Sequence, residues 1–299
     1  MPITPEPRRE HPSTYFLQDR SNEEELKRLE LQDRMAALAL GGLLPEQPDA
    51  TRFTRVLDVA CGTGGWLIEL AKAYPHISQL VGVDISGKMI EYARARAEAE
   101  HVSDRVEFHV MDALRMLEFP NRFFDLVNQR FGMAYMRTWD WPKLLQEFYR
   151  VAQPGGVIRL TESDLADKGS SPALLQLFLL LAQALNHAGH LFAPEQFGIA
   201  DQLLSLLQQF GYGLLDLQTR AYTLEYRAGT PAGQLYADDM QHAFRTAVPF
   251  LRKWALVPDT YEDIYQQMIH EMQQPDFVAT CHAIIAWGIR PPGNALFQP

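Results

Sequence analysis

The chain has 299 residues, of which 47% are hydrophobic and 21% are charged, and its net charge is −10. This composition is ordinary for a globular protein of one large domain, or of a domain with a cap, that buries a sizeable core. The acidic balance disfavours a nucleic-acid partner, because binding to nucleic acid usually requires a basic face.

The N-terminal third of the chain begins with an arm and a helix. Residues 1–20 are Pro-rich and polar and lack the apolar core of a signal peptide. Ser21 and Glu24 have the spacing of a capping box and predict a helix from about Asn22 to Leu40.

From Thr54 to about residue 165, short apolar strands alternate with amphipathic helices. This pattern predicts an α/β fold with a doubly wound, mostly parallel sheet.

The C-terminal part, residues 166–299, has a different pattern. Helices are predicted at 171–189, 193–211, 232–251 and 259–274, and strands at 214–226 and 277–290. We expect these helices to form a cap over the ligand-binding edge of the sheet. The longest apolar run, residues 173–185, is too short to span a bilayer, so no membrane partner is expected. The predicted organisation is therefore an arm and lid helix (1–50), a core (51–165), and cap segments with the last strands (166–299).

The two cysteines and the ends of the predicted strands indicate which chemistry the chain can support. Cys61 and Cys281 have no metal-ligand spacing and form no disulfide framework, so a reducing, cytoplasmic compartment is expected.

In an open α/β sheet, ligands bind at the carboxyl ends of the strands. A dinucleotide fingerprint would need a glycine where Leu67 stands, and the lysine of a Walker loop is also missing. Neither known pyrophosphate cradle is present, which argues against a nicotinamide-dependent oxidoreductase.

The stretch from Arg55 to Ala71, RVLDVACGTGGWLIELA, resembles motif I of the class I S-adenosylmethionine-dependent methyltransferases. The resemblance continues through VGVDIS, FHVMDAL, FDLVNQRF and RVAQPGGVIRLTES, in the right order over about residues 53–165. It implies a seven-stranded Rossmann-like sheet with an N-terminal helical lid. It also implies S-adenosylmethionine as cofactor and S-adenosylhomocysteine as product.

The same resemblance assigns cofactor-binding roles to residues at the strand ends. The expected set is Tyr15 from the lid, Asp58 near the amino end, Ala60, Gly62 and Gly64 beside the methionine part, Asp84 on the ribose hydroxyls, Ile85 and Met111 on the adenine faces, Asp112 on the adenine amino group, and Asn128 after the fourth strand. Taken singly, the Gly-rich stretch is also explained as a strand-to-helix turn, Asp84 and Asp112 as cap or turn residues, and Met111 as part of the core. Tyr15 and its neighbour Phe16 fit a packing anchor as well as a lid.

The acceptor is expected to be a small molecule. The place after the fourth strand, residues 128–131, lacks the Asn/Asp-Pro-Pro-aromatic motif of base and glutamine-amide methyltransferases. The paired glutamates of arginine methyltransferases are missing there, and no Asp-Asn pair of the metal-dependent catechol class occurs, so no metal is expected. The organisation resembles methyltransferases of bacterial secondary metabolism and, more distantly, the ubiquinone and menaquinone C-methyltransferases. Ten aromatic or methionine residues are candidates to line an apolar pocket: Phe131, Met133, Tyr135, Trp139, Phe192, Phe197, Tyr236, Met240, Phe244 and Trp254.

Three residues are the main candidates for catalysis. His190 ends a predicted cap helix and can serve as a base, and Glu162 follows the fifth strand at the edge where an acceptor would lie. Arg130 can hold an acidic group of substrate or cofactor, or pair with a carboxylate. His187, His242 and Asp164 are further acid–base candidates. A non-catalytic protein of the same fold that binds S-adenosylmethionine is the alternative, and a homodimer is possible.

Overall fold

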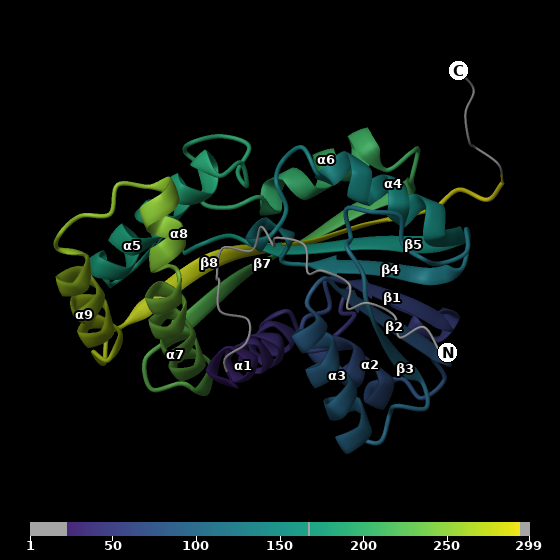
Figure 1. The fold of residues 1–299 in the computed structure, drawn as a ribbon, viewed down its shortest axis with the longest axis horizontal. Helices are drawn as coiled ribbons and strands as arrows, with labels where there is room; N and C mark the ends of the chain where they lie inside the picture. The colour runs from purple at the N-terminus through teal and green to yellow at the C-terminus, as the bar shows by residue number, and fades with distance from the viewer. Residues whose placement is uncertain (1–22, 167, 294–299) are drawn as a thin grey trace, which may run out of the picture.

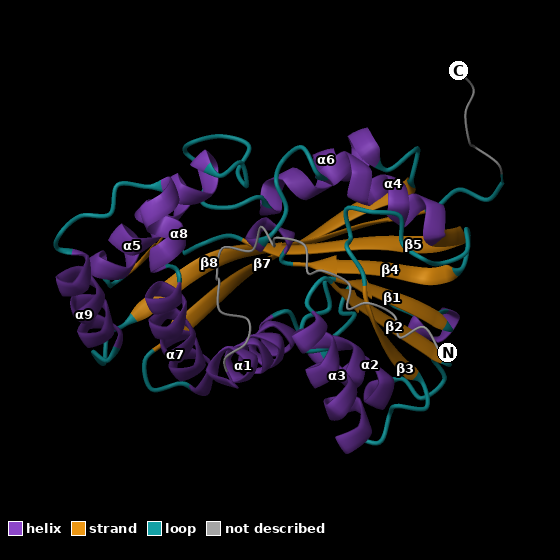
Figure 2. Cartoon of the chain, viewed as in Figure 1, coloured by secondary structure: helices purple, strands orange, loops and turns teal. Residues whose placement is uncertain are grey.

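The computed structural model describes residues 23–166 and 168–293. One sheet, in the order β3-β2-β1-β4-β5-β8-β6 with β7 also paired to β8, runs through both lobes of the molecule (Figures 1 and 2). The parallel strands are β1 (Arg55–Val59), β2 (Gln79–Asp84), β3 (Val106–Val110), β4 (Phe124–Arg130) and β5 (Ala152–Ser163), and the antiparallel ones are β6 (Lys168–Gly169), β7 (Leu215–Arg227) and β8 (Val278–Ile289). The predicted doubly wound, mostly parallel sheet is confirmed.

The described sheet has eight strands rather than the seven expected. The additional strand is β6, a two-residue segment in which Lys168 pairs with Thr280 and Gly169 with Ala279. It pairs with the part of β8 that extends beyond the end of β5. A segment this short has no periodicity that a sequence pattern can reveal.

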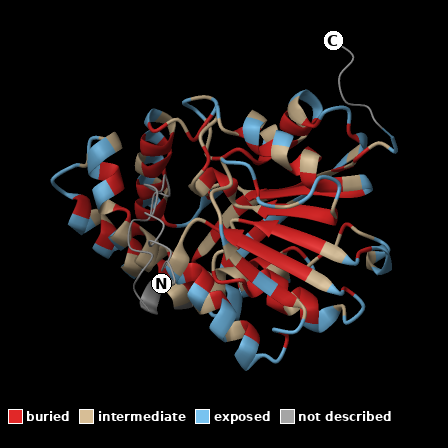
Figure 3. Ribbon diagram, turned by 45° about the vertical axis from the view of Figure 1, so that its right-hand side comes forward, coloured by how far each residue is buried: buried red, intermediate tan, exposed pale blue. Residues whose placement is uncertain are grey.

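Helices cover both faces of the parallel strands. Helices α2 (Gly65–Ala73) and α3 (Gly87–Ala99) lie on one face, and α4 (Trp141–Val151) and α6 (Leu203–Phe210) lie on the other (Figure 1). Successive residues of a strand point to opposite faces of the sheet. In β1, Val56 packs in the same hydrophobic cluster as Leu67 of α2, whereas the next residue, Leu57, packs in the cluster on the other face, with Leu144 of α4. Buried residues accordingly run through the middle of the sheet (Figure 3).

The second lobe is the cap. It contains α5 (Pro172–His187), α7 (Pro231–Thr246), α8 (Val248–Trp254) and α9 (Tyr261–Met272), and α1 (Glu23–Ala39) packs against α7. β5 pairs with β8 only as far as Ser163 opposite Ala283, but β8 begins at Val278, so β7 and β8 continue beneath the cap helices (Figure 1). The cap is thereby attached to the core through continuous strands.

Two of the predicted helices are shorter than the sequence pattern indicated. The helix expected at 232–251 is divided into α7 and α8, because Pro249 has no backbone N–H and its ring excludes the carbonyl four residues earlier. Of the helix expected at 193–211, the structure contains α6 and one 3-10 turn, Ala200–Gln202. Two further 3-10 turns are Ala50–Arg52 and Gly132–Ala134. Ser21 of the expected capping box lies outside the described residues.

No helix within residues 23–166 and 168–293 combines the length and the apolar character needed to cross a bilayer.

Candidate active site

The loop after β1 is the first component of the site. Ala60, Gly62 and Gly64 all have left-handed backbone conformations, with φ angles of 59°, 54° and 72°. The Gly64 N–H donates to the Cys61 carbonyl at 3.0 Å, which closes the turn that begins α2. Ala60 holds a conformation that costs an L-residue about 1–2 kcal/mol, so the loop imposes this backbone path on a residue that does not favour it.

The two motif glycines have different surroundings. A Cβ on Gly62 would have no heavy atom of the described residues within 4 Å, and Gly62 lines the cavity at the strand ends. A Cβ on Gly64 would lie 2.5 Å from the Phe108 ring and 3.0 Å from the Ala93 methyl group, and Gly64 does not line the cavity. Gly62 therefore leaves open space on the cavity side of the loop. Gly64 instead lets α2 and α3 pack against β3, so its expected place beside the methionine part of the cofactor is not where the structure puts it.

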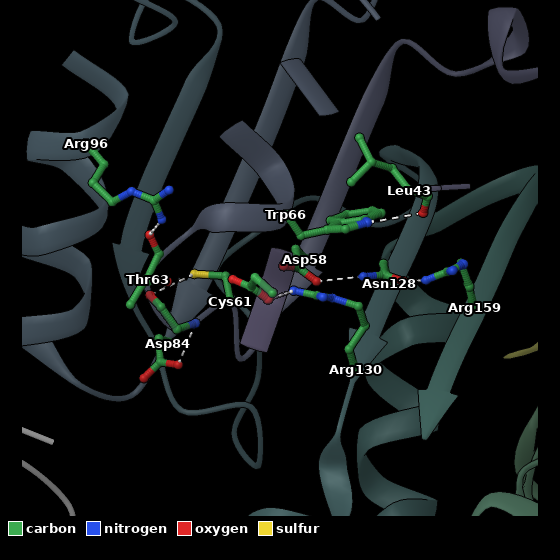
Figure 4. Close-up of polar contacts among 12 residues, drawn as sticks. Leu43, Asp58, Cys61, Thr63, Trp66, Asp84, Arg96, Asn128, Arg130 and Arg159 are labelled. Atoms are coloured by element: carbon green, nitrogen blue, oxygen red, sulfur yellow. Dashed lines mark hydrogen bonds and ion pairs between the residues drawn. The ribbon is translucent and has the colours of Figure 1, made fainter. Parts of the chain in front are cut away.

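Carboxylates at the ends of β2 and β3 face the same cavity. Asp84 accepts from the Gly62 N–H at 3.1 Å and from the Ser86 N–H at 2.8 Å, so it also ties the β1 and β2 loops together (Figure 4). Asp112 accepts from the Leu114 N–H at 2.9 Å. Both carboxylates line the cavity, with Ile85 and Met111 between them in sequence. The structure thus brings together four of the residues predicted at the strand ends.

Asp58 and Asn128 lie behind the cavity wall. The Asn128 amide donates to Asp58 Oδ1 at 2.7 Å, and Arg159 Nη1 donates to Asn128 Oδ1 at 2.7 Å, so the three side chains form a line (Figure 4). Burial raises the pKa of the Asp58 carboxyl to about 6, although Arg130 and the Asn128 hydrogen bond favour the charged form. Asp58 Oδ2 has no hydrogen-bond partner among the described residues. Neither Asp58 nor Asn128 lines the cavity itself.

Arg130 reaches the cavity from the end of β4. Its Nη2 donates to Asp33 Oδ1 of α1 at 2.8 Å, and its guanidinium lies 5.6 Å from the centroid of the Trp66 ring. Arg130 Nε is buried and has no hydrogen-bond partner among the described residues. Of the two alternatives considered for Arg130, the ion pair with a carboxylate is present, and one buried donor is left over.

Glu162 lies at the end of β5, where the core meets the cap. Its Oε1 accepts from the Gly132 N–H at 2.5 Å and its Oε2 from the Met133 N–H at 3.4 Å. Glu162 lines the cavity but is almost fully buried, and burial raises the pKa of its carboxyl to about 8. Tyr135, which accepts from Gln129 Nε2 at 3.1 Å, lines the cavity beside it. A carboxyl group in this position is a stronger base than an exposed one when it is ionised.

The histidine candidates lie elsewhere. His190 is buried and donates from Nδ1 to the Met133 carbonyl at 2.8 Å, but it does not line the cavity. Burial lowers the pKa of its imidazole. His187 donates to the Trp254 carbonyl at 2.7 Å, and His242 lines a second hollow beyond α7. His190 as a catalytic base does not fit this structure, because its ring supports the Met133 loop from behind and does not face the cavity. Tyr15 lies outside the described residues.

The cavity, of about 350 Å³, runs from the strand-end loops into the cap. Of the ten aromatic and methionine residues considered from the sequence, those that line it are Phe131, Met133, Tyr135, Tyr236, Met240 and Phe244. Trp139 is instead 61% exposed. Asp164 also lines the cavity, and its Oδ1 accepts from the Ala200 N–H at 2.9 Å. The described residues contain no cluster of three or more His, Cys, Asp or Glu side chains that could hold a metal ion.

Comparison with known proteins places this geometry in a family. The profile of a methyltransferase domain matches residues 56–156. The demethylmenaquinone methyltransferase of Lactiplantibacillus plantarum is 31% identical over 169 residues, which are 52% of this chain and 69% of that protein. The chain belongs to the class I S-adenosylmethionine-dependent methyltransferases. A second demethylmenaquinone methyltransferase, from Deinococcus radiodurans, is 38% identical over 124 residues, which are 42% of this chain and 49% of that protein.

Solved structures agree on the fold of this methyltransferase. The phosphoethanolamine N-methyltransferase 2 of Haemonchus contortus, in complex with S-adenosylhomocysteine, has a TM-score of 0.53 at 18% identity and covers 92% of this chain and 60% of that one. The [4+2]-cyclase SpnF has a TM-score of 0.51 at 20% identity and covers 89% of this chain and 95% of that one. At these identities the likeness establishes the fold alone, and the named reactions differ.

The residues of this methyltransferase fit S-adenosylmethionine, its cofactor. The methionine end of the cofactor carries one cationic amino group and one carboxylate. Asp58 Oδ2 and Arg130 Nε, both close to the β1 loop, are a buried acceptor and a buried donor that have no hydrogen-bond partner among the described residues. These two atoms belong to groups of opposite charge that lie close enough to interact, so they match the two charged groups at this end of the cofactor. The open space over Gly62 is consistent with the same ligand.

Several residues of the site are not apparent from the sequence motifs. Asp33 and Arg28, both of α1, line the cavity, and Arg28 forms a buried ion pair of 2.5 Å with Asp239 of α7. Glu46 forms another buried ion pair, of 2.8 Å, with Arg159. The one signal available was that Arg28 and Asp33 interrupt an amphipathic helix with charges. Their partners come from distant parts of the chain, and no local pattern identifies those.

Proposed function

We propose that this methyltransferase transfers the methyl group of S-adenosylmethionine to a small, largely apolar aromatic molecule that is bound between the sheet edge and the cap. The observation that carries the proposal is the continuity of the cavity. The same space is bordered by Gly62, Asp84 and Asp112 at one end and by Phe178, Tyr236 and Phe244 at the other. An acceptor in the cap therefore lies beside a cofactor at the strand ends, as methyl transfer requires.

At the cofactor end, each polar group has a proposed partner. Arg130, which lines the cavity, serves the carboxylate of the methionine part through its unsatisfied Nε, and Asp58, directly behind the β1 loop, attracts the cationic amino group with its charge. Asp84 accepts from the ribose hydroxyls, since its carboxylate ends β2 on the cavity side. Asp112 accepts from the adenine amino group, between the apolar side chains of Ile85 and Met111.

At the acceptor end, Glu162 is proposed as the general base. Bound S-adenosylmethionine would supply a methyl group attached to a sulfonium sulfur: the acceptor would form a bond to the methyl carbon, and the sulfur would keep the electrons of the broken C–S bond as a neutral thioether. The Glu162 carboxylate takes up the proton that the acceptor loses. The N–H groups of Gly132 and Met133 hold the carboxylate in place. Because a base with a pKa near 8 is ionised in only about a tenth of molecules at pH 7, turnover should increase with pH toward 8.

The acceptor class follows from the cap lining and is consistent with the relatives. The cap side of the cavity contributes methionine, leucine and aromatic side chains, which suit a flat ring with apolar substituents. Demethylmenaquinone, the compound named in several of the relatives, is an isoprenylated naphthoquinone. We therefore propose hydroxylated one- and two-ring aromatic compounds, quinols among them, as acceptors. Cys61 and Cys281 are both buried, and neither forms a disulfide bond within the described residues, which is in keeping with the reducing, cytoplasmic setting that we propose for such chemistry.

The proposal can be tested in two steps. Isothermal titration with S-adenosylhomocysteine measures cofactor binding, and Asp84→Ala should weaken it about tenfold or more. The protein is then incubated with methyl-labelled S-adenosylmethionine and reduced naphthoquinones, simple phenols and aliphatic amines, and the products are separated by mass. Labelled aromatic products that disappear in Glu162→Gln would support the proposal. Binding without transfer to any compound would favour the non-catalytic alternative.

A further inference from the structure

Four buried side chains connect the segment after the lid helix to the cofactor end of the site. Arg159 Nε donates to Glu46 Oε1 at 2.8 Å, and Arg159 Nη2 lies 3.3 Å from Glu46 Oε2. On its other side, Arg159 donates to Asn128, and Asn128 donates to Asp58, each at 2.7 Å. All four side chains are shielded from solvent. The chain Glu46–Arg159–Asn128–Asp58 therefore crosses three strands, β5, β4 and β1, without a gap (Figure 4 shows its last three members).

The direction of the hydrogen bonds in this chain is determined by Arg159. A guanidinium can only donate, so the Asn128 atom that faces it must be the carbonyl oxygen, Oδ1. The amide nitrogen of Asn128 then has to face Asp58 Oδ1 and donate to it. Glu46 in turn holds the guanidinium through two of its nitrogen atoms, which restricts its orientation. One oxygen of Asp58 is thus occupied by Asn128, and the other, Oδ2, has no hydrogen-bond partner in residues 23–166 and 168–293.

We propose that Glu46, Arg159 and Asn128 act as positioning residues, which hold Asp58 in one orientation and keep its Oδ2 and its charge available to the amino end of S-adenosylmethionine. This inference rests on the proposed function, because it requires that Asp58 serves the cofactor. It assigns a role to Glu46, in the segment between α1 and β1, and to Arg159, in the middle of β5. It also gives Asn128 a role one step removed from the cofactor.

Charge balance supports the proposal. The groups around Asp58 come from every element packed against it: Arg130 of β4, Arg159 of β5, Asp33 of α1, Glu46 of the segment before β1, and Asp84 and Cys61 at the loop. Asp58, Asp33, Glu46 and Asp84 carry four negative charges, and Arg130 and Arg159 carry two positive charges. The group is therefore negative overall, and a bound ammonium would reduce this excess of negative charge. Burial already makes Asp58 harder to ionise, so the removal of Arg159 should make it harder still.

The test is the pH dependence of cofactor binding. S-adenosylhomocysteine is titrated into the full-length protein between pH 5 and 7.5, the range in which its amino group stays charged. The wild-type affinity should be constant above about pH 6 and decrease below it, as Asp58 takes up a proton. In the double variant Glu46→Gln/Arg159→Met, no buried charge is left unpaired, so the fold should survive. The affinity of this variant for S-adenosylhomocysteine should be about tenfold weaker at pH 7.5. The midpoint pH, at which the affinity has fallen to half its high-pH value, should be higher than in the wild type.

Two further variants separate positioning from structural support. Asn128→Asp has nearly the same shape and can still accept from Arg159, but it places a second carboxyl group against Asp58, so the midpoint should again increase. Arg290→Met is the matched control, because Arg290 is as buried as Arg159 but donates to the Ala152 carbonyl and does not take part in the hydrogen bonds that lead to Asp58. It should lose stability and keep the wild-type midpoint. The positioning role is wrong if the wild type binds S-adenosylhomocysteine and both test variants bind it with an affinity within twofold of the wild type and with the same midpoint pH. If the wild type does not bind, the proposed function is wrong.

Discussion

Alanine substitutions at three glycines distinguish a ligand contact from a packing contact. Gly62, Gly64 and Gly155 all have left-handed backbones, with φ angles of 54°, 72° and 80°. Only Gly64 has heavy atoms within 4 Å of the position that a Cβ would occupy, and only Gly62 lines the cavity. Gly62→Ala should therefore affect binding, Gly64→Ala should affect folding, and Gly155→Ala should report the backbone strain alone.

The expected magnitudes follow from these contacts. Left-handed strain costs an L-residue about 1–2 kcal/mol, and this cost applies to all three substitutions. At Gly64 the new methyl group would lie 2.5 Å from the Phe108 ring, and overpacking of a core adds about 1–3 kcal/mol. We expect Gly64→Ala to reduce the free energy of unfolding by about 2–5 kcal/mol and the other two variants by about 1–2 kcal/mol. At Gly62 the methyl group enters the cofactor space, so the affinity for S-adenosylhomocysteine should fall about tenfold or more.

Urea unfolding and isothermal titration measure the two effects independently. The folded fraction of Gly64→Ala should still bind S-adenosylhomocysteine with an affinity near that of the wild type, because the methyl group would lie between α3 and β3, outside the cavity lining. Equal stability of Gly62→Ala and Gly64→Ala would refute the packing role of Gly64. Unchanged affinity of Gly62→Ala, at the same stability as Gly155→Ala, would refute the assignment of the open space to the cofactor.

Three further predictions concern buried charged groups. Glu162→Gln should lower kcat at least a hundredfold with cofactor affinity unchanged. Since folding raises the pKa of Glu162 to about 8 and that of Asp58 to about 6, wild-type stability should decrease as pH rises from about 5 to 8; urea titrations of the variant should lose the part of this decrease that lies above about pH 6. His190→Ala should cost about 2–4 kcal/mol of stability but less than tenfold in kcat, and a larger kinetic loss would restore it as a candidate base. Arg28→Met should destabilise the protein by about 3–5 kcal/mol, and adding Asp239→Leu should recover most of this; no recovery would contradict the ion pair as the cause.

The positions of the strand-end residues were accessible from the sequence because they depend on local features. An apolar strand followed by a turn puts the next polar residue at the sheet edge, whatever packs above it. Asp84 and Asp112 line the cavity for this reason, and so do Ile85 and Met111. The same local logic found Glu162, which ends β5.

Contacts between distant segments were not accessible in this way. His190 follows α5, as its sequence position suggested, but the fold of the cap turns its ring toward the Met133 carbonyl and away from the cavity. The helix pattern could not indicate this, because the orientation depends on how the 131–136 loop packs beneath it. Pro249 did carry a signal, and the division between α7 and α8 was predictable from it.

The sequence by itself determined the α/β architecture, the identity of the cofactor and most of the strand-end residues, because hydrophobic period and motif spacing are properties of short segments. Only the tertiary structure separated Gly62 from Gly64, since the two have the same backbone preference and differ in whether open space or Phe108 lies above them. Only the tertiary structure joined Glu46 to Arg159, 113 residues apart, and through Asn128 to Asp58. Contacts of this kind form when strands that are distant in the chain become neighbours in the sheet, and burial then makes each unpaired charge costly.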